Sequence, residues 1–157
     1  MATGAKPNQR DLRGEILGLL NQVMDPEIPV ISIVELGIIR DIEVGAQPHV
    51  IITPTYVGCP ATDMIENMIR EKLDAHNYEH VGIKNRLSPA WTTAWIADEA
   101  QEKLRIYGID PPGTHPPSCP RCGSHNTRLI SEFGSTPCKA LHSCKDCLEP
   151  FDRFKCH

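Results

Sequence analysis

Two pairs of cysteines near the end of the chain constrain its fold more than any other feature. The first pair is Cys119 and Cys122, the second is Cys144 and Cys147, and 21 residues separate the pairs. Each C-x-x-C pair can form a knuckle whose thiolates face one cation, and a chain that returns as a hairpin brings two knuckles together. Gly123 follows the first pair and permits the positive φ that a knuckle needs. Four thiolates leave no open coordination position, so the spacing predicts a structural Zn²⁺ rather than a catalytic one.

The number and positions of the cysteines favour metal binding over disulfide bonds. The chain has seven cysteines, and six of them lie in residues 119–157. The amino terminus lacks the basic and apolar regions of a signal peptide, and no apolar run approaches the roughly 18 residues of a membrane span. We therefore expect a cytoplasmic protein without a membrane anchor. Cys138 and Cys156 lie near the four expected ligands, and the spacing leaves open whether one replaces a ligand or both form a second thiol pair.

A proline-rich stretch divides the chain into two unequal parts. Residues 108–118 contain four prolines and two glycines, which cannot continue a helix or occupy a central strand. Residues 1–118 carry ten Lys and Arg against 16 Asp and Glu, a net charge of −6, whereas residues 119–157 carry six against four, a net of +2. The expected organisation is a disordered amino terminus (1–10), a main domain (11–110), a linker (111–118) and a zinc ribbon (119–157).

The apolar periodicity of the main domain alternates between helix and strand patterns. In chain order the expected elements are a helix (11–24), two strands (37–44 and 50–55), a helix (60–77), a strand (81–87) and a helix (92–107). Trp91 and Trp95 are four residues apart, so we expect them to share a helix face. This order predicts an α+β fold, in which helices pack on a small mixed sheet and a zinc ribbon follows.

Cys59, the cysteine outside the tail, lies at the start of the strongest helical pattern. If Pro60 is the first helical residue, Cys59 is the N-cap, and the positive end of the helix dipole favours its thiolate form. A small buried apolar residue explains Cys59 equally well, because free cysteines are usually buried.

A second candidate is the acidic turn after the first helix. Asp25 and Glu27 flank Pro26, so two carboxylates are held on a rigid segment. Such a turn could contribute to a metal or partner site, or it could end the helix and face solvent. Composition favours the second interpretation, because solvated acidic turns are common.

Several ordered motifs resemble the SufT-type domain family, which is associated with iron–sulfur cluster assembly. They are Asp25-Pro26-Glu27, the stretch 34–42, Thr53-Pro54-Thr55 and Gly58-Cys59-Pro60. The series spans residues 12–112 and is far more specific than any single motif. Two later stretches, 88–93 and 107–112, resemble one branch, the PaaD family of accessory proteins of the phenylacetyl-CoA epoxidase system, also named PaaJ. The tail stretches 131–136 and 138–141 are similar to the zinc-binding extension of that branch.

The resemblance implies a maturation role rather than catalysis. Members of the wider family deliver or assemble iron–sulfur clusters on client proteins, and PaaD-like proteins accompany an oxygenase with a di-iron hydroxylase and a [2Fe–2S] reductase. The reactive cysteine of the family falls on Cys59, and its acidic motif falls on Asp25 and Glu27. The expected partners are therefore the reductase, the hydroxylase or both.

The number of thiolates limits how a cluster could be held. A stable cluster needs four protein ligands, usually thiolates, and the main domain has one. A homodimer would supply two, which suits transient transfer better than permanent electron transfer. The chain contains no paired Glu-x-x-His motif of a di-iron hydroxylase, so the epoxidation chemistry belongs elsewhere. We therefore expect a non-catalytic subunit.

Two other classes of function remain alternatives. Either C-x-x-C pair could serve a thiol–disulfide oxidoreductase, but redox motifs normally occur singly at a helix start. The ribbon could bind nucleic acid, but four acids offset its six basic residues and aromatic residues are few. The sequence therefore predicts no nucleic-acid partner.

Overall fold

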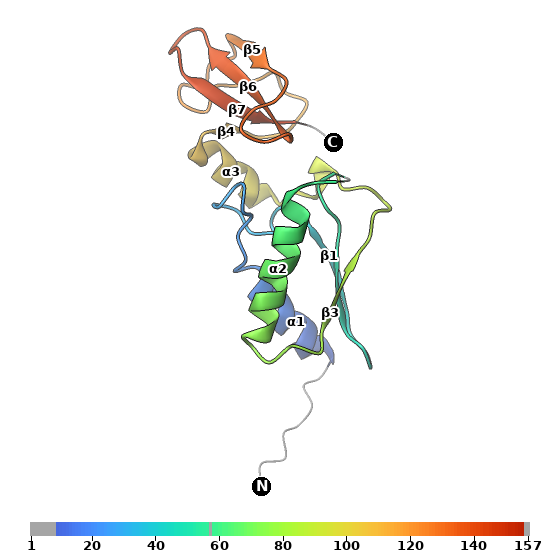
Figure 1. Cartoon of the computed structure of the whole chain (residues 1–157). Coiled ribbons are helices and arrows are strands. Elements are labelled where there is room, and N and C mark those ends of the chain that lie inside the picture. Colours follow the sequence, from blue (N-terminus) through green and yellow to red (C-terminus); the bar gives the residue numbers. More distant parts are fainter. Residues whose placement is uncertain (1–8, 57, 156–157) are drawn as a thin grey trace. The chain divides into compact units, whose positions relative to one another are not determined.

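A computed structural model describes residues 9–56 and 58–155 of the chain. The helices are α1 (Gln9–Leu20), α2 (Ala61–Asp74), the short 3₁₀ helix η1 (Thr93–Trp95) and α3 (Asp98–Tyr107) (Figure 1). The strands are β1 (Ile39–Glu43), β2 (His49–Ile52), β3 (Gly82–Asn85), β4 (Ile109–Asp110), β5 (Thr127–Ser131), β6 (Lys139–Cys144) and β7 (Pro150–Phe154). They form two small sheets, so the predicted α+β fold class is confirmed. In the part of the chain that the structure describes, no helix is long and apolar enough to cross a membrane.

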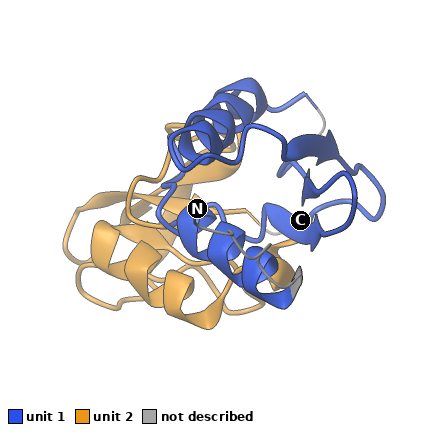
Figure 2. Cartoon of the chain, turned by 90° about the horizontal axis from the view of Figure 1, so that it is seen from below, with its two compact units in different colours: residues 1–26, 32–91 blue, residues 27–31, 92–157 orange. Residues whose placement is uncertain are grey.

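The described residues form two compact units (Figure 2). The first contains the chain up to Pro26 together with residues 32–91, and the second contains residues 27–31 and the chain from Thr92 onwards. The division therefore lies earlier than the predicted boundary after residue 110. Helix α3 and strand β4, which we expected in the main domain, belong to the same unit as the cysteine pairs.

The first unit is built on a mixed sheet of three strands in the order β1-β2-β3. β1 and β2 are antiparallel, and β2 and β3 are parallel. The chain between β2 and β3 contains α2, which provides the crossover that a parallel pair needs. Helices α1 and α2 pack against each other and bury one apolar stripe each. The buried side chains of these stripes are Ile16 and Leu20 on α1 and Ile65, Ile69 and Leu73 on α2. Each contributes about 1.5–3 kcal/mol relative to an exposed position, so this apolar layer stabilises the first unit.

The first and last predicted helices have different limits in the structure. α1 ends at Leu20 rather than at residue 24, because Met24 pairs with Ser32 and the carbonyl of Val23 accepts the N–H of Ile33. Extended backbone at Ala97 separates η1 from α3, so residues 92–107 are not one helix.

The prediction that Trp91 and Trp95 share a helix face is therefore wrong. Trp91 lies outside any helix, and its indole N–H donates to the carbonyl of Leu36 at 3.0 Å. Trp95 is the last residue of η1. The Thr92 side chain accepts the N–H of Ala94 and starts this short helix after Trp91.

The second unit contains a four-stranded sheet in the order β4-β7-β6-β5. β5, β6 and β7 are antiparallel neighbours, and β4 adds to β7 in parallel, with Ile109 opposite Asp152 and Asp110 opposite Arg153. A boundary after residue 110 would separate β4 from the strand with which it pairs.

The proline-rich stretch after β4 is fastened to this sheet. Arg153 forms a 2.6 Å ion pair with Asp110, whose side chain is 1% exposed. The same guanidinium donates to the carbonyls of Gly113 at 3.1 Å and His115 at 2.9 Å. Asp110 also accepts the N–H of Ser118 at 3.1 Å. Residues 111–118, which we expected to be a linker, are therefore held by hydrogen bonds along their length.

Candidate metal centre and Cys59 hollow

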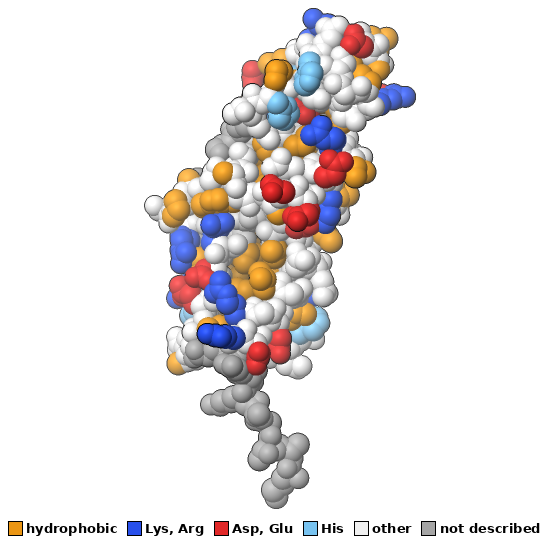
Figure 3. All heavy atoms as spheres, turned by 180° about the vertical axis from the view of Figure 1, so that it is seen from behind, with side chains coloured by type: hydrophobic (Ala, Val, Ile, Leu, Met, Phe, Trp, Pro, Cys, Tyr) orange, Lys and Arg blue, Asp and Glu red, His pale blue; other side chains and the backbone are white. Residues whose placement is uncertain are grey.

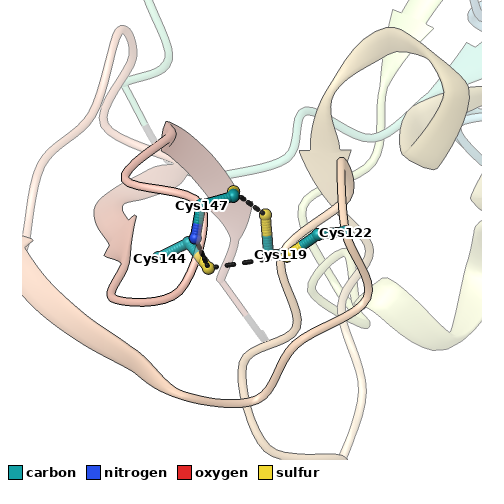
Figure 4. A group of neighbouring side chains, drawn as sticks. All are labelled: Cys119, Cys122, Cys144 and Cys147. Atoms are coloured by element: carbon teal, nitrogen blue, oxygen red, sulfur yellow. Dashed lines mark hydrogen bonds between the residues drawn. The ribbon is translucent and has the colours of Figure 1, made fainter.

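Four cysteines converge in the second unit from two turns far apart in the sequence. The sulfurs of Cys119 and Cys147 are 3.6 Å apart, as are those of Cys122 and Cys144, and all four lie within 4.8 Å of one another (Figure 4). A tetrahedron of thiolates about 2.3 Å from zinc has edges of about 3.8 Å. The sulfurs are too far apart for disulfides, which need about 2.05 Å. The geometry therefore fits a four-thiolate zinc site.

The two knuckles repeat one backbone arrangement. The N–H of Cys119 donates to the carbonyl of Ser124, and the N–H of Cys144 donates to the carbonyl of Glu149, both at 2.9 Å. The residue after each second cysteine has a positive φ, 78° at Gly123 and 65° at Leu148. The sequence predicts a positive φ at Gly123, and the structure has one there. The equivalent role of Leu148 was missed, because a leucine gives no sign of a positive φ.

The two converging cysteine pairs lie partly inside the unit. Cys119 and Cys144 are buried and form an apolar cluster with Phe151, against which Cys147 packs, whereas Cys122 is exposed. Phe151 lies on β7, so the third strand of the ribbon supports both knuckles. One side of the site therefore faces protein and the other faces solvent.

The four thiols cannot all ionise easily without a cation. The N–H of Cys147 donates to the sulfur of Cys144 at 3.5 Å, and this is the largest of the causes that lower the pKa of Cys144 to about 7. The N–H of Ser124 favours the thiolate of Cys122, but desolvation and the neighbouring thiols outweigh it and raise the pKa of Cys122 to about 12. Neighbouring negative charges oppose one another, and a divalent metal held by all four sulfurs would offset this repulsion.

Polar side chains link the knuckles to each other. Arg121 and Glu149, one from each knuckle, form a 2.6 Å ion pair. Asp146 accepts hydrogen bonds from the Ser124 hydroxyl and from Asn126 at 2.7 Å, and these bonds lower the pKa of its carboxyl group, with that of Ser124 the larger. Sequence reasoning did not identify these contacts, because charged residues between paired cysteines look like ordinary solvated positions.

For two further cysteines of the tail, the spacing leaves a ligand role open. Cys138 is buried, its sulfur lies 3.0 Å from the hydroxyl oxygen of Thr136, and it is outside the group of four converging cysteines. Cys156 lies outside the described residues. Among residues 9–56 and 58–155, Cys119, Cys122, Cys144 and Cys147 are the one group of three or more His, Cys, Asp or Glu side chains placed to share an ion.

In the first unit, Cys59 opens into a hollow at the start of α2. The structure places the N-cap at Pro60, which has helical dihedral angles, so Cys59 lies one residue further from the helix than we expected. The hollow has a volume of about 440 Å³. Its lining residues are Pro54, Gly58, Cys59, Pro60, Thr62, Asp63, Asn85 and Leu87. The Thr55 hydroxyl donates to the sulfur of Cys59 at 3.8 Å. The thiol is half-buried, so the simple interpretation as a fully buried residue does not hold.

The acidic turn is not part of the lining of this hollow. Asp25 is 5% exposed and belongs to the first unit, whereas Glu27 is half-buried and belongs to the second. The two carboxylates of the turn therefore belong to different compact units. A shared role of these three residues stays a prediction.

Comparison with known proteins assigns a family to each part of the chain. Residues 13–82 match a family model described as iron–sulfur cluster assembly protein, and residues 112–155 match one described as PaaD zinc beta ribbon domain. The chain is 34% identical over 93 residues to an Fe-S protein maturation auxiliary factor of Porphyromonas gingivalis, which covers 57% of this chain and 88% of that protein. A crystal structure of a domain of unknown function, DUF59, from Bacillus anthracis matches 62% of this chain and 95% of its own with a TM-score of 0.57 at 24% identity, and it supports the fold.

A fuller match extends over both units. The chain is 50% identical over 151 residues to a protein of Escherichia coli (strain K12) that is named as one of the subunits of a "Putative 1,2-phenylacetyl-CoA epoxidase", and the match covers 90% of this chain and 92% of that protein. In this chain the two family models detect an assembly domain followed by a PaaD zinc ribbon. The chain therefore belongs to the PaaD family of phenylacetyl-CoA epoxidase subunits, in which an iron–sulfur cluster assembly domain precedes a zinc ribbon.

Proposed function

We propose that this protein is a non-catalytic accessory factor of a phenylacetyl-CoA epoxidase, and that it assists iron–sulfur or iron cofactor assembly on the reductase or hydroxylase components. The observation that carries this proposal is a half-buried thiol in an open hollow of an iron–sulfur assembly domain, joined in one chain to a PaaD ribbon. The name of the Escherichia coli relative supports the epoxidase as the client system.

In this role Cys59 is a temporary ligand of iron or of a cluster that is passed on. The hollow supplies one thiol, and Thr62 and Asp63 are among the residues that line it. A resident cluster usually needs four thiolates, so the cargo would complete its ligand set with small thiols, a second copy of the chain or a client cysteine. Such incomplete ligation favours release. Asp25 and Glu27 remain proposed contributors through the acidic motif of the family.

The ribbon, in the same proposal, holds Zn²⁺ through Cys119, Cys122, Cys144 and Cys147. Their spacing and mutual distances suit this ion, which would supply a rigid crosslink between the knuckles and no reactive position. The ribbon would then present a surface to the client components, while transfer takes place at Cys59. Zinc would be structural and iron would be cargo.

Genetic complementation with matched cysteine variants tests this proposal. A strain that lacks the gene receives the wild-type gene, Cys59→Ser or Cys138→Ser, and the epoxidase components are purified without oxygen. We expect Cys59→Ser to leave the components depleted in iron or acid-labile sulfide, whereas Cys138→Ser restores normal loading, since the Cys138 thiol is buried outside both sites. Full cofactor loading in the deletion strain would exclude the assembly role.

The thiol–disulfide oxidoreductase alternative is weakened by the arrangement of the tail sulfurs. A redox pair closes within one C-x-x-C motif, whereas the 3.6 Å contacts here join the first motif to the second. Thiol titration before and after chelation separates the two functions. Zinc ligands become titratable together when the metal is removed, whereas a redox pair titrates without a chelator.

The charge distribution argues against a nucleic-acid-binding ribbon. Acidic and basic side chains lie side by side on the face drawn in Figure 3, and they do not form one basic patch there. In the ribbon, Arg121 and Arg153 are already paired with Glu149 and Asp110. We expect no salt-dependent mobility shift with single- or double-stranded DNA at physiological salt.

A further inference from the structure

The free edge of β3 lies next to the Cys59 hollow. In the described part of the chain β3 is the last strand of its sheet and has β2 as its one neighbour. The N–H groups of Gly82 and Arg86 donate towards β2, to the carbonyls of Pro48 at 2.9 Å and Ile52 at 2.8 Å. Backbone groups alternate along a strand, so those of Ile83 and Asn85 turn away from β2. They form the edge to which another strand could add.

The fold holds this edge in a defined position. The guanidinium group of Arg70 on α2 donates to the carbonyls of Val81 at 2.6 Å and Tyr78 at 2.9 Å, which fixes the start of β3. At the other end, the Thr53 hydroxyl donates to the carbonyl of Arg86 at 2.6 Å. The edge is therefore prearranged for a partner, which reduces the entropy cost of binding.

The two faces of the edge have different chemistry. Asn85 and Leu87 line the Cys59 hollow, and Leu87 is 56% exposed. Lys84 and Arg86 point to the opposite face, because side chains alternate along a strand. One face thus offers the hollow and its thiol, and the other offers two exposed cations spaced two residues apart.

These cations are available to a partner. Lys84 forms no ion pair with any residue of the described ranges, and Arg86 has a long contact of 3.6 Å with Glu43. The unit around them is acidic, because residues 1–26 and 32–91 carry eight Lys and Arg against 11 Asp and Glu, a net charge of −3. A local basic edge on an acidic unit favours a segment with acidic side chains at alternate positions.

We propose that β3 is the docking strand for an extended client segment in which acidic residues alternate with apolar residues around a cysteine. The segment adds to the outward backbone groups of Ile83 and Asn85, its acidic side chains pair with Lys84 and Arg86, and its cysteine reaches the Cys59 hollow. This inference rests on the proposed function, since it names how a client cysteine is brought to the transfer thiol.

Binding of a designed peptide tests the docking step without thiol chemistry. The probe is a blocked seven-residue peptide in which aspartates occupy positions one, three, five and seven, valines positions two and six, and cysteine position four. It is titrated into full-length, ¹⁵N-labelled, zinc-loaded Cys59→Ser protein. We expect the amide signals of Ile83 and Asn85 to shift and their hydrogen exchange to slow. No binding, or shifts confined to other elements, would overturn the proposal.

Two variants of Asn85 separate backbone docking from side-chain contacts. Asn85→Pro removes the outward N–H but keeps the N–H groups of Lys84 and Arg86 that face β2, and proline is tolerated at such an edge position. Asn85→Ala is the matched control, because it loses the same side-chain contact with Glu66 and keeps the N–H. We expect Asn85→Pro to bind about fivefold more weakly than Asn85→Ala. Equal affinities would show that the peptide does not add as a strand.

A charge exchange tests whether acidic side chains of the segment pair with the basic edge of β3. This docking proposal can fail while the maturation role holds, and the reverse is also possible. Lys84→Glu should weaken binding of the aspartate peptide, and a peptide with lysine at positions three and five should then bind the variant better than it binds the wild type. If peptides dock as expected while Cys59→Ser protein still supports cofactor loading, the docking strand stands and the proposed function fails. If Cys59 is required in cells but no peptide docks at β3, the proposed function stands and the docking strand fails.

Discussion

One residue distinguishes the two knuckles of the candidate metal centre. Gly123 and Leu148 occupy equivalent positions and both have a positive φ. The conformation at Gly123 was predictable, because glycine adopts it without steric cost. At Leu148 it was not, since the hydrogen bond from Cys144 to the carbonyl of Glu149 imposes a backbone that leucine disfavours.

Replacing this leucine should stabilise the ribbon. Leu148 is 77% exposed, so Leu148→Gly loses little packing and removes the left-handed strain. The gain is about 1 kcal/mol, partly offset by the greater freedom of glycine in the unfolded chain. We expect the denaturation midpoint of the zinc-loaded ribbon to rise. Gly123→Leu is the matched control and should lower it, and a lower midpoint for Leu148→Gly would mean that the exposed leucine makes a stabilising contact.

Single cysteine substitutions should identify the metal ligands. Cys122→Ser removes one of four converging sulfurs and should reduce bound zinc well below one ion per chain, because the remaining thiols no longer form a closed shell. Cys138→Ser is the control, since its sulfur is outside that group, and it should keep the full zinc content. Metal analysis of the purified variants measures both. A fully loaded Cys122→Ser protein would assign the fourth ligand to another residue.

At the scale of elements, the long periodic segments were predictable and the short ones were not. The apolar stripe of α2 and the β1–β2 hairpin follow from side-chain spacing, which is a local property. Strand β4 has two residues, and its pairing with β7 depends on backbone bonds between segments about 40 residues apart. The ion pair between Asp110 and Arg153 could not be inferred from the sequence for the same reason, so residues 111–118 were predicted as a linker.

Breaking that ion pair should release the proline-rich stretch. Arg153→Met leaves the carboxylate of Asp110 without its guanidinium partner and frees the carbonyls of Gly113 and His115. Removing one member of a buried pair costs about 3–5 kcal/mol. We expect limited proteolysis to cut near Thr114 in the variant and not in the zinc-loaded wild type. Arg121→Met, which removes the exposed pair with Glu149, is the control and should stay resistant. Rapid cutting of the wild type at the same site would restore the linker interpretation.

At the scale of the whole chain, the two parts expected from the sequence correspond to units with different sources of stability. The first unit has an apolar core between α1, α2 and the sheet, which can form without a metal. The core of the second unit includes three of the four converging cysteines themselves. The sequence showed this contrast through cysteine spacing and apolar periodicity. It did not show that α3 and β4 belong with the ribbon, because neither carries a cysteine or a charge pattern that marks the association.

Metal removal should reveal the true boundary between these units. A small ribbon has too little core to fold without its ion, so chelation of zinc should expose the amides of β5, β6 and β7 to rapid hydrogen exchange. The amides of β2 and α2 should stay protected, because their core does not contain the ligands. The amides of Ile109 and Asp110 decide between the two boundaries. They should lose protection together with β7, to which β4 is paired, whereas a boundary after residue 110 requires them to stay protected with the first unit. If β2 and α2 also lose protection on chelation, the two units unfold as one cooperative structure, and the stability of the assembly domain depends on the ribbon metal.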